Sequence, residues 1–444
     1  MIRIANGQGF WGDWLEAPVR LIERGPIDYL TLDYLAEVTM SILQKQKQRD
    51  ARLGYARDFP PLIARIADRI RERNIKVLAN AGGVNPLACA REVRRLAPGL
   101  KVAAVLGDDI FARIDEFLAK GCQLRSLDTG EPIAAVRDRL LSANAYLGAF
   151  PLAQALGTGA DVVVSGRCAD AALALAPMIQ RFLWQETDWD LLAAGCVAGH
   201  IIECGAQATG GNFQGDWQSL PDLAEIGYPI VEAEPGGMCT ITKHPGTGGC
   251  VNSHVVKEQL LYEIGDPRRY VTPDCVVDFT SLRLEEVGPD RVRVRGARGG
   301  PRTGTLKVSA SYAAGWKATG TLVYSWPQAL EKAQAADRIV RQRLRQLGLQ
   351  FDCISTEFVG VNACHGPAAR PVQDPPEVEW RLGVRGQNKE AVERFTRELI
   401  PLVLSGPPGA TGYGEGRPPV REVVAYWPAL IPRQDIEPRV EVLG

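Results

Sequence analysis

Short apolar runs alternate with longer amphipathic segments through the first half of this chain. The apolar runs predict strands at residues 2–5, 29–33, 76–80, 102–106 and 161–165. Between them, apolar side chains recur at helical spacing and predict helices at about 16–24 and 61–74, and from Pro86 onward, where proline suits a first helical turn. Short buried strands that alternate with helices are typical of a mostly parallel sheet covered by helices on both faces.

The second half has a different pattern. Helical sequence continues at 171–180 and 190–204, and the glycine-rich segment 210–216 then interrupts it. Strands follow at 276–286 and 291–297 around the turn Gly288-Pro289-Asp290, and a further pair at 306–312 and 319–325 around Gly315-Trp316. From Thr319 the order is strand, helix (327–347), strand (355–361), strand (378–386), helix (389–404), strand (421–427), which indicates a split βαβ (ferredoxin-like) element. We therefore predict an α/β domain at 1–215 and an α+β domain at 216–444.

Composition narrows the class of protein. The 444 residues carry a net charge of −1 and no basic stripe, which argues against a nucleic-acid partner. The longest uncharged stretch, 140–160, contains Asn, Gln, Gly and Pro, which argues against a membrane-spanning helix. The ten cysteines form no CxxC pair, which indicates reduced thiols and no structural zinc. We expect a cytoplasmic homo-oligomer that acts on a small molecule, without a signal peptide and without a nucleic-acid or membrane partner.

The ends of the predicted strands share a chemical character. Each finishes in or beside Gly, Asn or Asp, at Asn6-Gly7, Asp33, Asn80-Ala81-Gly82-Gly83, Gly107-Asp108-Asp109 and Gly166-Arg167. Because ligands of parallel α/β sheets bind at the carboxyl ends of strands, we expect a shared site there. The predicted substrate-binding residues on these loops are Asn80, Gly82, Gly83, Asn85, Arg167 and Asp170. The alternative is that these loops use Gly and Asp only for their turn geometry.

A second candidate segment is Thr242-Lys243-His244-Pro245-Gly246-Thr247-Gly248-Gly249. Proline after His244 favours an extended backbone, and the glycines can bring bare N–H groups close to an anion. We predict His244 as a catalytic residue and Lys243, Gly246, Thr247, Gly248 and Gly249 as binding residues for a phosphate, a carboxylate or an enolate oxygen. A tight turn with an incidental histidine explains the same string.

Three carboxylates complete the predicted catalytic set. Asp33 and Glu37 lie four residues apart at a strand end, and Glu203 follows His200 by three residues on one helical face. Neighbouring carboxylates can serve as acid and base. A charge at a helix start, a satisfied core network, or a metal site completed by another ligand are the alternatives, and we predict no metal.

The segment Gly7-Gln8-Gly9-Phe10-Trp11-Gly12 matches a dinucleotide-binding pattern. The bulky Phe10 and Trp11, and the negative Asp13 where a pyrophosphate would lie, argue against that interpretation. No cofactor is predicted, although coenzyme A remains possible as part of the substrate.

The strings at 29–40, 199–211 and 242–249, together with 80–86 and 164–170, resemble the acyclic terpene utilisation family of AtuA-type proteins. The resemblance covers residues 3 to about 427. It implies a place in bacterial catabolism of branched acids and terpenoids, whose intermediates are acyl-CoA thioesters, and a hydratase or lyase acting on an acyl-CoA or carboxylic acid.

Two other functions stay open at this point. One is a non-catalytic binding or assembly component of a degradation complex. The other is a thioester or lactone hydrolase that uses Cys204 or Cys250.

Overall fold

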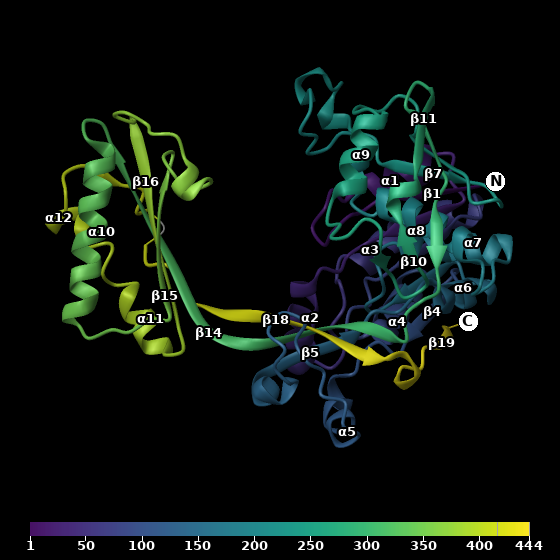
Figure 1. The fold of residues 1–444 in the computed structure, drawn as a ribbon, viewed down its shortest axis with the longest axis horizontal. Coiled ribbons are helices and arrows are strands. Elements are labelled where there is room, and N and C mark those ends of the chain that lie inside the picture. The colour runs from purple at the N-terminus through teal and green to yellow at the C-terminus, as the bar shows by residue number, and fades with distance from the viewer. Residues whose placement is uncertain (415, 444) are drawn as a thin grey trace. The chain divides into compact units, whose positions relative to one another are not determined.

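The computed structural model describes residues 1–414 and 416–443 and divides into two compact units (Figure 1). The larger comprises Met1–Ser311 and Tyr426–Gly444, and the smaller comprises Tyr312–Ala425. The chain passes between them within strand β14 (Thr305–Ser325) and again within strand β18 (Arg421–Pro432). This division differs from the predicted boundary at 215/216, because strands beyond residue 216 join the sheet built by the first half.

A mixed ten-stranded sheet forms the centre of the larger unit, in the order β11-β12-β8-β7-β1-β2-β3-β6-β4-β19. The middle strands, from β1 to β4 in this order, pair in parallel, whereas the flanking strands pair antiparallel. The predicted α/β class and parallel centre are confirmed. The strands of this sheet are β1 (Ile2–Asn6), β2 (Tyr29–Leu32), β3 (Lys76–Ala79), β4 (Val102–Leu106), β6 (Val162–Ser165), β7 (Pro229–Ala233), β8 (Cys239–Lys243), β11 (Arg283–Gly288), β12 (Arg291–Arg295) and β19 (Arg439–Leu443).

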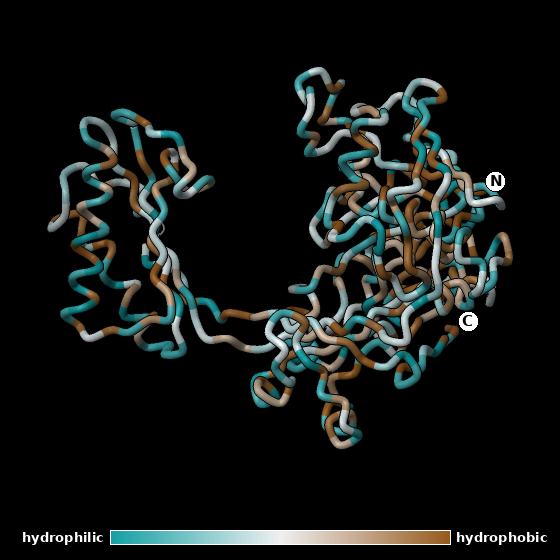
Figure 2. Tube along the Cα trace, in the orientation of Figure 1, coloured by the Kyte–Doolittle hydropathy of each residue, from teal (hydrophilic) through white to brown (hydrophobic). Residues whose placement is uncertain are grey.

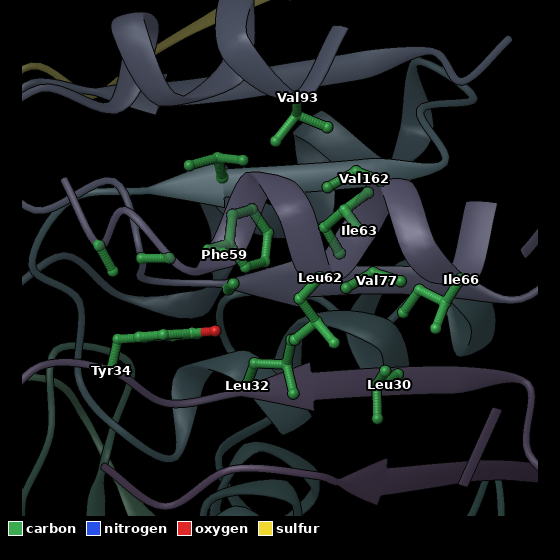
Figure 3. Close-up of a cluster of buried hydrophobic side chains, with 14 of the residues drawn as sticks. Leu30, Leu32, Tyr34, Phe59, Leu62, Ile63, Ile66, Val77, Val93 and Val162 are labelled. Atoms are coloured by element: carbon green, nitrogen blue, oxygen red, sulfur yellow. The ribbon is translucent and has the colours of Figure 1, made fainter. Parts of the chain in front are cut away.

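Helices cover this sheet. One group packs on it through Ile63, Ile66 and neighbouring apolar residues, which meet Leu30 and Val77 of the strands (Figure 3). Each such fully buried aliphatic side chain contributes about 1.5–3 kcal/mol. Figure 2 shows that hydrophobic segments gather in the interior of the larger unit. This group contains α1 (Glu16–Arg24), α3 (Phe59–Glu72) and α4 (Pro86–Leu96), and a second group contains α6 (Ala149–Gly157), α7 (Ala172–Phe182) and α8 (Trp189–Ile202).

Further elements complete the larger unit around the sheet. They are helices α2 (Glu37–Arg49), α5 (Ile114–Ala119) and α9 (Ser253–Leu261), and strands β5 (Leu140–Ala145), β9 (Tyr270–Val271), β10 (Val276–Asp278) and β13 (Arg298–Gly300). Strand β5 pairs with β14, and β13, β10 and β9 form a small sheet of their own.

The smaller unit contains the predicted split βαβ element. Its sheet has the order β15-β16-β14-β17, and β18 also pairs with β14. The elements are β14, α10 (Ala329–Gln346), β15 (Cys353–Val359), β16 (Glu377–Gly386), α11 (Lys389–Phe395), α12 (Leu402–Ser405), β17 (Ala410–Thr411) and β18. The core of this unit is formed where Val340 and Phe395 of the helices pack on Leu322 and Trp380 of the strands.

Two predictions for this region were wrong. The segment predicted as two strands around Gly315-Trp316 is the single strand β14. Gly315 has a positive φ of 92° without turning the chain, because the following residues pair continuously with β16. The helix predicted at 389–404 is two helices, and the second begins after Pro401, which cannot continue a helix from before it.

No helix within residues 1–414 and 416–443 is both long enough and apolar enough to cross a bilayer.

Candidate functional site

A cavity of about 500 Å³ lies in the larger unit. Its charged and aromatic lining comes from segments that are distant in sequence. Glu37 begins α2, Tyr146 follows β5, and Arg167 and Asp170 follow β6. The remaining polar and aromatic lining residues are His200, Glu203, Glu263, Arg269, Tyr270, Thr272, Thr303, Thr305 and Lys307.

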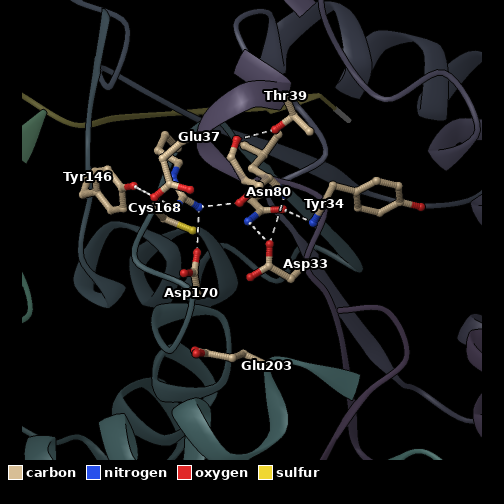
Figure 4. Close-up of polar contacts among 12 residues, drawn as sticks. Asp33, Tyr34, Glu37, Thr39, Asn80, Tyr146, Cys168, Asp170 and Glu203 are labelled. Carbon is tan, nitrogen blue, oxygen red and sulfur yellow. Dashed lines mark hydrogen bonds and ion pairs between the residues drawn. The ribbon is translucent and has the colours of Figure 1, made fainter. Parts of the chain in front are cut away.

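Arg167 is the centre of a hydrogen-bond network beside this cavity. Figure 4 labels its partners Tyr146 and Asp170. Its side chain is only 2% exposed and donates to the Leu35 carbonyl at 2.8 Å, to the Asp170 carboxylate at 2.6 Å and to the Tyr146 hydroxyl at 3.0 Å. The guanidinium carbon also lies 4.2 Å from the centroid of the Tyr146 ring. A buried cation needs such partners, and these hold the guanidinium in one orientation.

Glu37 accepts the next hydrogen bond of the network. The Tyr146 hydroxyl donates to Glu37 at 3.0 Å, and the Lys307 ammonium lies 3.9 Å from the same carboxylate. Burial raises the pKa of Glu37, but Arg167 and the bond from Tyr146 outweigh that effect, so the pKa is lowered and Glu37 stays ionised. Glu37 therefore acts in this network as an anion that orients Tyr146.

His200 and Glu203 form a buried pair in the same lining. His200 Nδ1 lies 3.1 Å from Glu203 Oε1, and the two side chains are 1% and 9% exposed. Burial raises the pKa of Glu203 to about 7, although the neighbouring His200 opposes the shift. His200 Nε2 and Glu203 Oε2 are buried without a partner in the described part of the chain. Leaving such groups unpaired costs about 1–3 kcal/mol each, which indicates positions where a ligand or water would bond.

Asp33 and Asn80 form a second buried group, which does not line the cavity (Figure 4). Asn80 donates to Asp33 at 2.7 Å and accepts from the backbone of Tyr34 at 2.6 Å. Burial, reinforced by the charge of Asp170, raises the pKa of Asp33 well above its usual value. No hydrogen bond joins Asp33 to Glu37 among the described residues: Asp33 accepts from Asn80, whereas Glu37 accepts from Tyr146.

His244 lies away from this network. It follows β8, and Asp33 follows β2, so three steps across the sheet (β8-β7-β1-β2) separate them, a distance of about 14 Å at the usual strand spacing. Its side chain is buried, and burial followed by the charge of Lys243 lowers its pKa. Of the four histidines, the structure places His200 in the cavity lining and not His244.

The loop after His244 is held in place by hydrogen bonds within the chain. The N–H groups of Gly248 and Gly249 donate to the Glu225 and Pro221 carbonyls at 2.8 and 2.7 Å. Lys243 donates to the Thr247 carbonyl at 2.7 Å and pairs with an aspartate at 3.1 Å. These donors are therefore occupied within the chain, and the geometry does not support them as anion ligands; the remaining predicted residue, Gly246, lies beside them on the exposed turn.

The Gly82-Gly83 loop has a structural explanation as well. A Cβ on Gly82 would lie 2.5 Å from the Ser165 carbonyl oxygen, so only glycine allows β3 and β6 to end side by side there. The Gly82 and Gly83 N–H groups donate to the Ser165 and Asn80 carbonyls, and Asn85 donates to two carbonyls of residues 51–53. These predicted binding residues shape the loop and make no contact with the cavity.

The dinucleotide interpretation finds no support in the geometry. The Gly9 N–H donates to the Asp13 carboxylate at 2.9 Å, and Asp13 also accepts from the Tyr228 hydroxyl at 2.7 Å. A side chain of the protein thus occupies the position where the glycine-rich turn would bind a pyrophosphate.

The candidate thiols are not activated. Burial raises the pKa of Cys204 to about 12, and it also raises the pKa of Cys250. A thiol nucleophile needs a lowered pKa to form thiolate at neutral pH, so the arrangement does not favour a cysteine hydrolase.

Tyr146, Lys307 and Arg269 were not predicted from the sequence. Tyr146 lies in the uncharged stretch after β5, and Lys307 is one polar residue in an alternating strand. No local signal distinguishes either residue, and only the pairing of β5 with β14 brings them together.

Within the part of the chain that the structure describes, no group of three His, Cys, Asp or Glu side chains is placed to hold a metal ion. Comparison with curated proteins finds no match, and neither does comparison with solved structures. The model of one family, the acyclic terpene utilisation family protein AtuA, matches residues 2–442. This match covers nearly the whole chain, and the protein therefore belongs to the AtuA family of acyclic terpene utilisation.

Proposed function

We propose that this protein is an acid–base enzyme of acyclic terpene utilisation, a hydro-lyase or carbon–carbon lyase acting on a branched carboxylic acid or its thioester. The observation that carries the proposal is the buried His200–Glu203 pair in a cavity of about 500 Å³. A carboxyl group with a pKa of about 7 can take up or release a proton at neutral pH, which is what general acid–base catalysis requires.

The lining supports the electrostatic part of such a reaction. Removal of a proton next to a carboxyl or thioester carbonyl develops negative charge on the carbonyl oxygen. Lys307 and Arg167 supply positive charge around the same cavity, and Arg167 Nε is a buried donor without a partner among the described residues. In a dehydration, the Glu203 carboxylate would accept the proton of the carbon next to the carbonyl. His200 would donate the proton of its unpartnered Nε2 to the hydroxyl, which leaves as water, so that a double bond forms.

The test is a screen of branched hydroxy acids, unsaturated acids and their CoA thioesters for gain or loss of one water by mass spectrometry. Exchange of the proton next to the carbonyl in D₂O, followed by NMR, detects the proton transfer even without net turnover. Glu203→Gln keeps the shape of the pair and removes its base, so we expect exchange to fall by about 10²–10⁴-fold. Glu23→Gln, an exposed site on α1, is the matched control.

Separate replacement of His200 and His244 tests whether the chemistry takes place in the cavity or at the glycine-rich loop after His244. His200→Ala should reduce exchange strongly, whereas His244→Ala should not, because His244 does not line the cavity. Loss of exchange in His244→Ala with retention in Glu203→Gln would place the chemistry at the other loop and refute the proposal.

A further inference from the structure

His200 packs against two aromatic rings from another part of the chain. The centroid of its imidazole lies 5.6 Å from that of Tyr270 and 5.5 Å from that of Phe279, with interplanar angles of 54° and 89°. The two aromatic rings also contact each other, with centroids 5.2 Å apart and an interplanar angle of 75°. The three rings therefore form one mutually packed group, the His200 ring cluster.

The small sheet β13-β10-β9 supplies both aromatic members of the His200 ring cluster. Tyr270 begins β9, and Phe279 directly follows β10. The antiparallel register places Tyr270 opposite Val277, and Phe279 follows two residues later, at the spacing that shares a face. Helix α8, which carries His200, packs on β10. Only the folded chain brings these rings together, because they come from segments far apart in sequence.

The proposed role of His200 requires one orientation of its ring. Nδ1 lies 3.1 Å from Glu203, and Nε2 is buried without a partner among the described residues. Rotation of the imidazole by half a turn would put carbon atoms in the places of both nitrogens, which would break the bond to Glu203 and remove the Nε2 donor. One hydrogen bond restrains this rotation weakly, so packing has to supply the remaining restraint.

Phe279 can influence the chemistry only through His200. It does not line the cavity, whereas Tyr270 does. Its ring is mostly buried and lies perpendicular to the imidazole, which opposes rotation of His200. Aromatic rings also attract cations, so this contact suits the protonated His200 that donates from Nε2 in the proposed function. A leucine side chain at this position would remain apolar but would lack the flat ring.

Resting on the proposed function, we infer that Phe279 is a positioning residue for His200. Its ring holds the imidazole with Nδ1 at Glu203 and leaves Nε2 free to donate. Phe279→Leu should therefore weaken the bond between His200 and Glu203 without changing any residue of the cavity lining.

NMR spectroscopy of the full-length protein labelled with ¹⁵N-histidine tests this inference without a substrate. A buried, hydrogen-bonded imidazole N–H exchanges slowly with water and gives a signal, which the exposed His254 and His365 should not give. His200→Ala identifies the signal of His200. We expect Phe279→Leu to speed exchange of this proton with water by about 3–10-fold, the effect of one aromatic contact, and Phe279→Tyr to retain the parent rate. Phe117→Leu, fully buried in the same unit and outside the cavity lining, is the matched control.

Far-UV circular dichroism checks that each variant folds. Phe279→Met, which also removes the ring, replaces the leucine variant if that variant does not fold. An unchanged exchange rate in the folded ring-less variant, or an equal change in Phe117→Leu, would overturn the inference.

The substrate proton-exchange test of Glu203 gives a separate answer. Substrate exchange that occurs in the parent protein should slow by about 3–10-fold in Phe279→Leu. Exchange that is not slowed would overturn the inference and leave the proposed function intact. Conversely, the expected NMR result without substrate exchange in any of these proteins would retain the positioning of His200 and refute the proposed chemistry.

Discussion

Replacement of Glu203 by Gln should change how the stability of this protein depends on pH. Burial raises the pKa of Glu203 from 4.5 to about 7 in the folded protein. Between these two values the folded state holds a proton that the unfolded state has released. The free energy of unfolding contributed by this group is therefore fully present below pH 4.5 and is lost as the pH rises towards 7.

The size of the effect follows from the same shift. A change of about 2.5 pH units corresponds to about 3 kcal/mol at 1.36 kcal/mol per unit. Glu203 is only 9% exposed, so solvent screening reduces this value little. The free energy of unfolding of Glu203→Gln, minus that of the parent protein, should therefore rise by about 2–3 kcal/mol between pH 5 and pH 8.

Urea unfolding at four pH values between 5 and 8 measures this difference. Tryptophan fluorescence and far-UV circular dichroism should be recorded together, because the two compact units need not unfold in one transition. Glu23→Gln, exposed on α1, should give a difference that does not vary with pH. A Glu203→Gln difference that stays constant or falls with rising pH would show that Glu203 is not a buried carboxyl of raised pKa.

Two further predictions concern thiols and glycines. Burial raises the pKa of Cys204 to about 12, so iodoacetamide at pH 8 should label the exposed Cys353 and Cys364 well before Cys204. Peptide mass spectrometry measures the labelling of each cysteine. Rapid labelling of Cys204 would restore it as a candidate nucleophile. Gly248→Ala should reduce the free energy of unfolding by about 1–3 kcal/mol, because its Cβ would lie 1.8 Å from the Asp222 carbonyl oxygen. Gly265→Ala, where a Cβ meets nothing within 4 Å, should change it by less than about 0.5 kcal/mol; equal effects in urea unfolding would contradict the packing explanation.

Local patterns predicted most of the elements that form the larger unit. Helix α1 and strand β4 have the predicted bounds, because their apolar positions follow a single period and their ends are marked by glycine or proline. The split βαβ order of the smaller unit was readable for the same reason. Strands β7 and β8 were missed, since their burial depends on pairing with β1 and with one another.

The candidate site was harder to predict from the sequence than the fold, because it depends on tertiary structure. The sequence singled out Glu203, Glu37 and Arg167, which do line one cavity, but gave equal weight to His244 and its glycines. A sequence does not show whether a backbone N–H is already hydrogen-bonded within the fold. The Gly248 N–H, for example, donates to the Glu225 carbonyl and is not available to a ligand. Side-chain identity thus determined which chemistry was available to this protein. The sheet order, the pairing of β5 with β14 and the burial of His200 decided where that chemistry is concentrated, because distance and desolvation exist only in three dimensions.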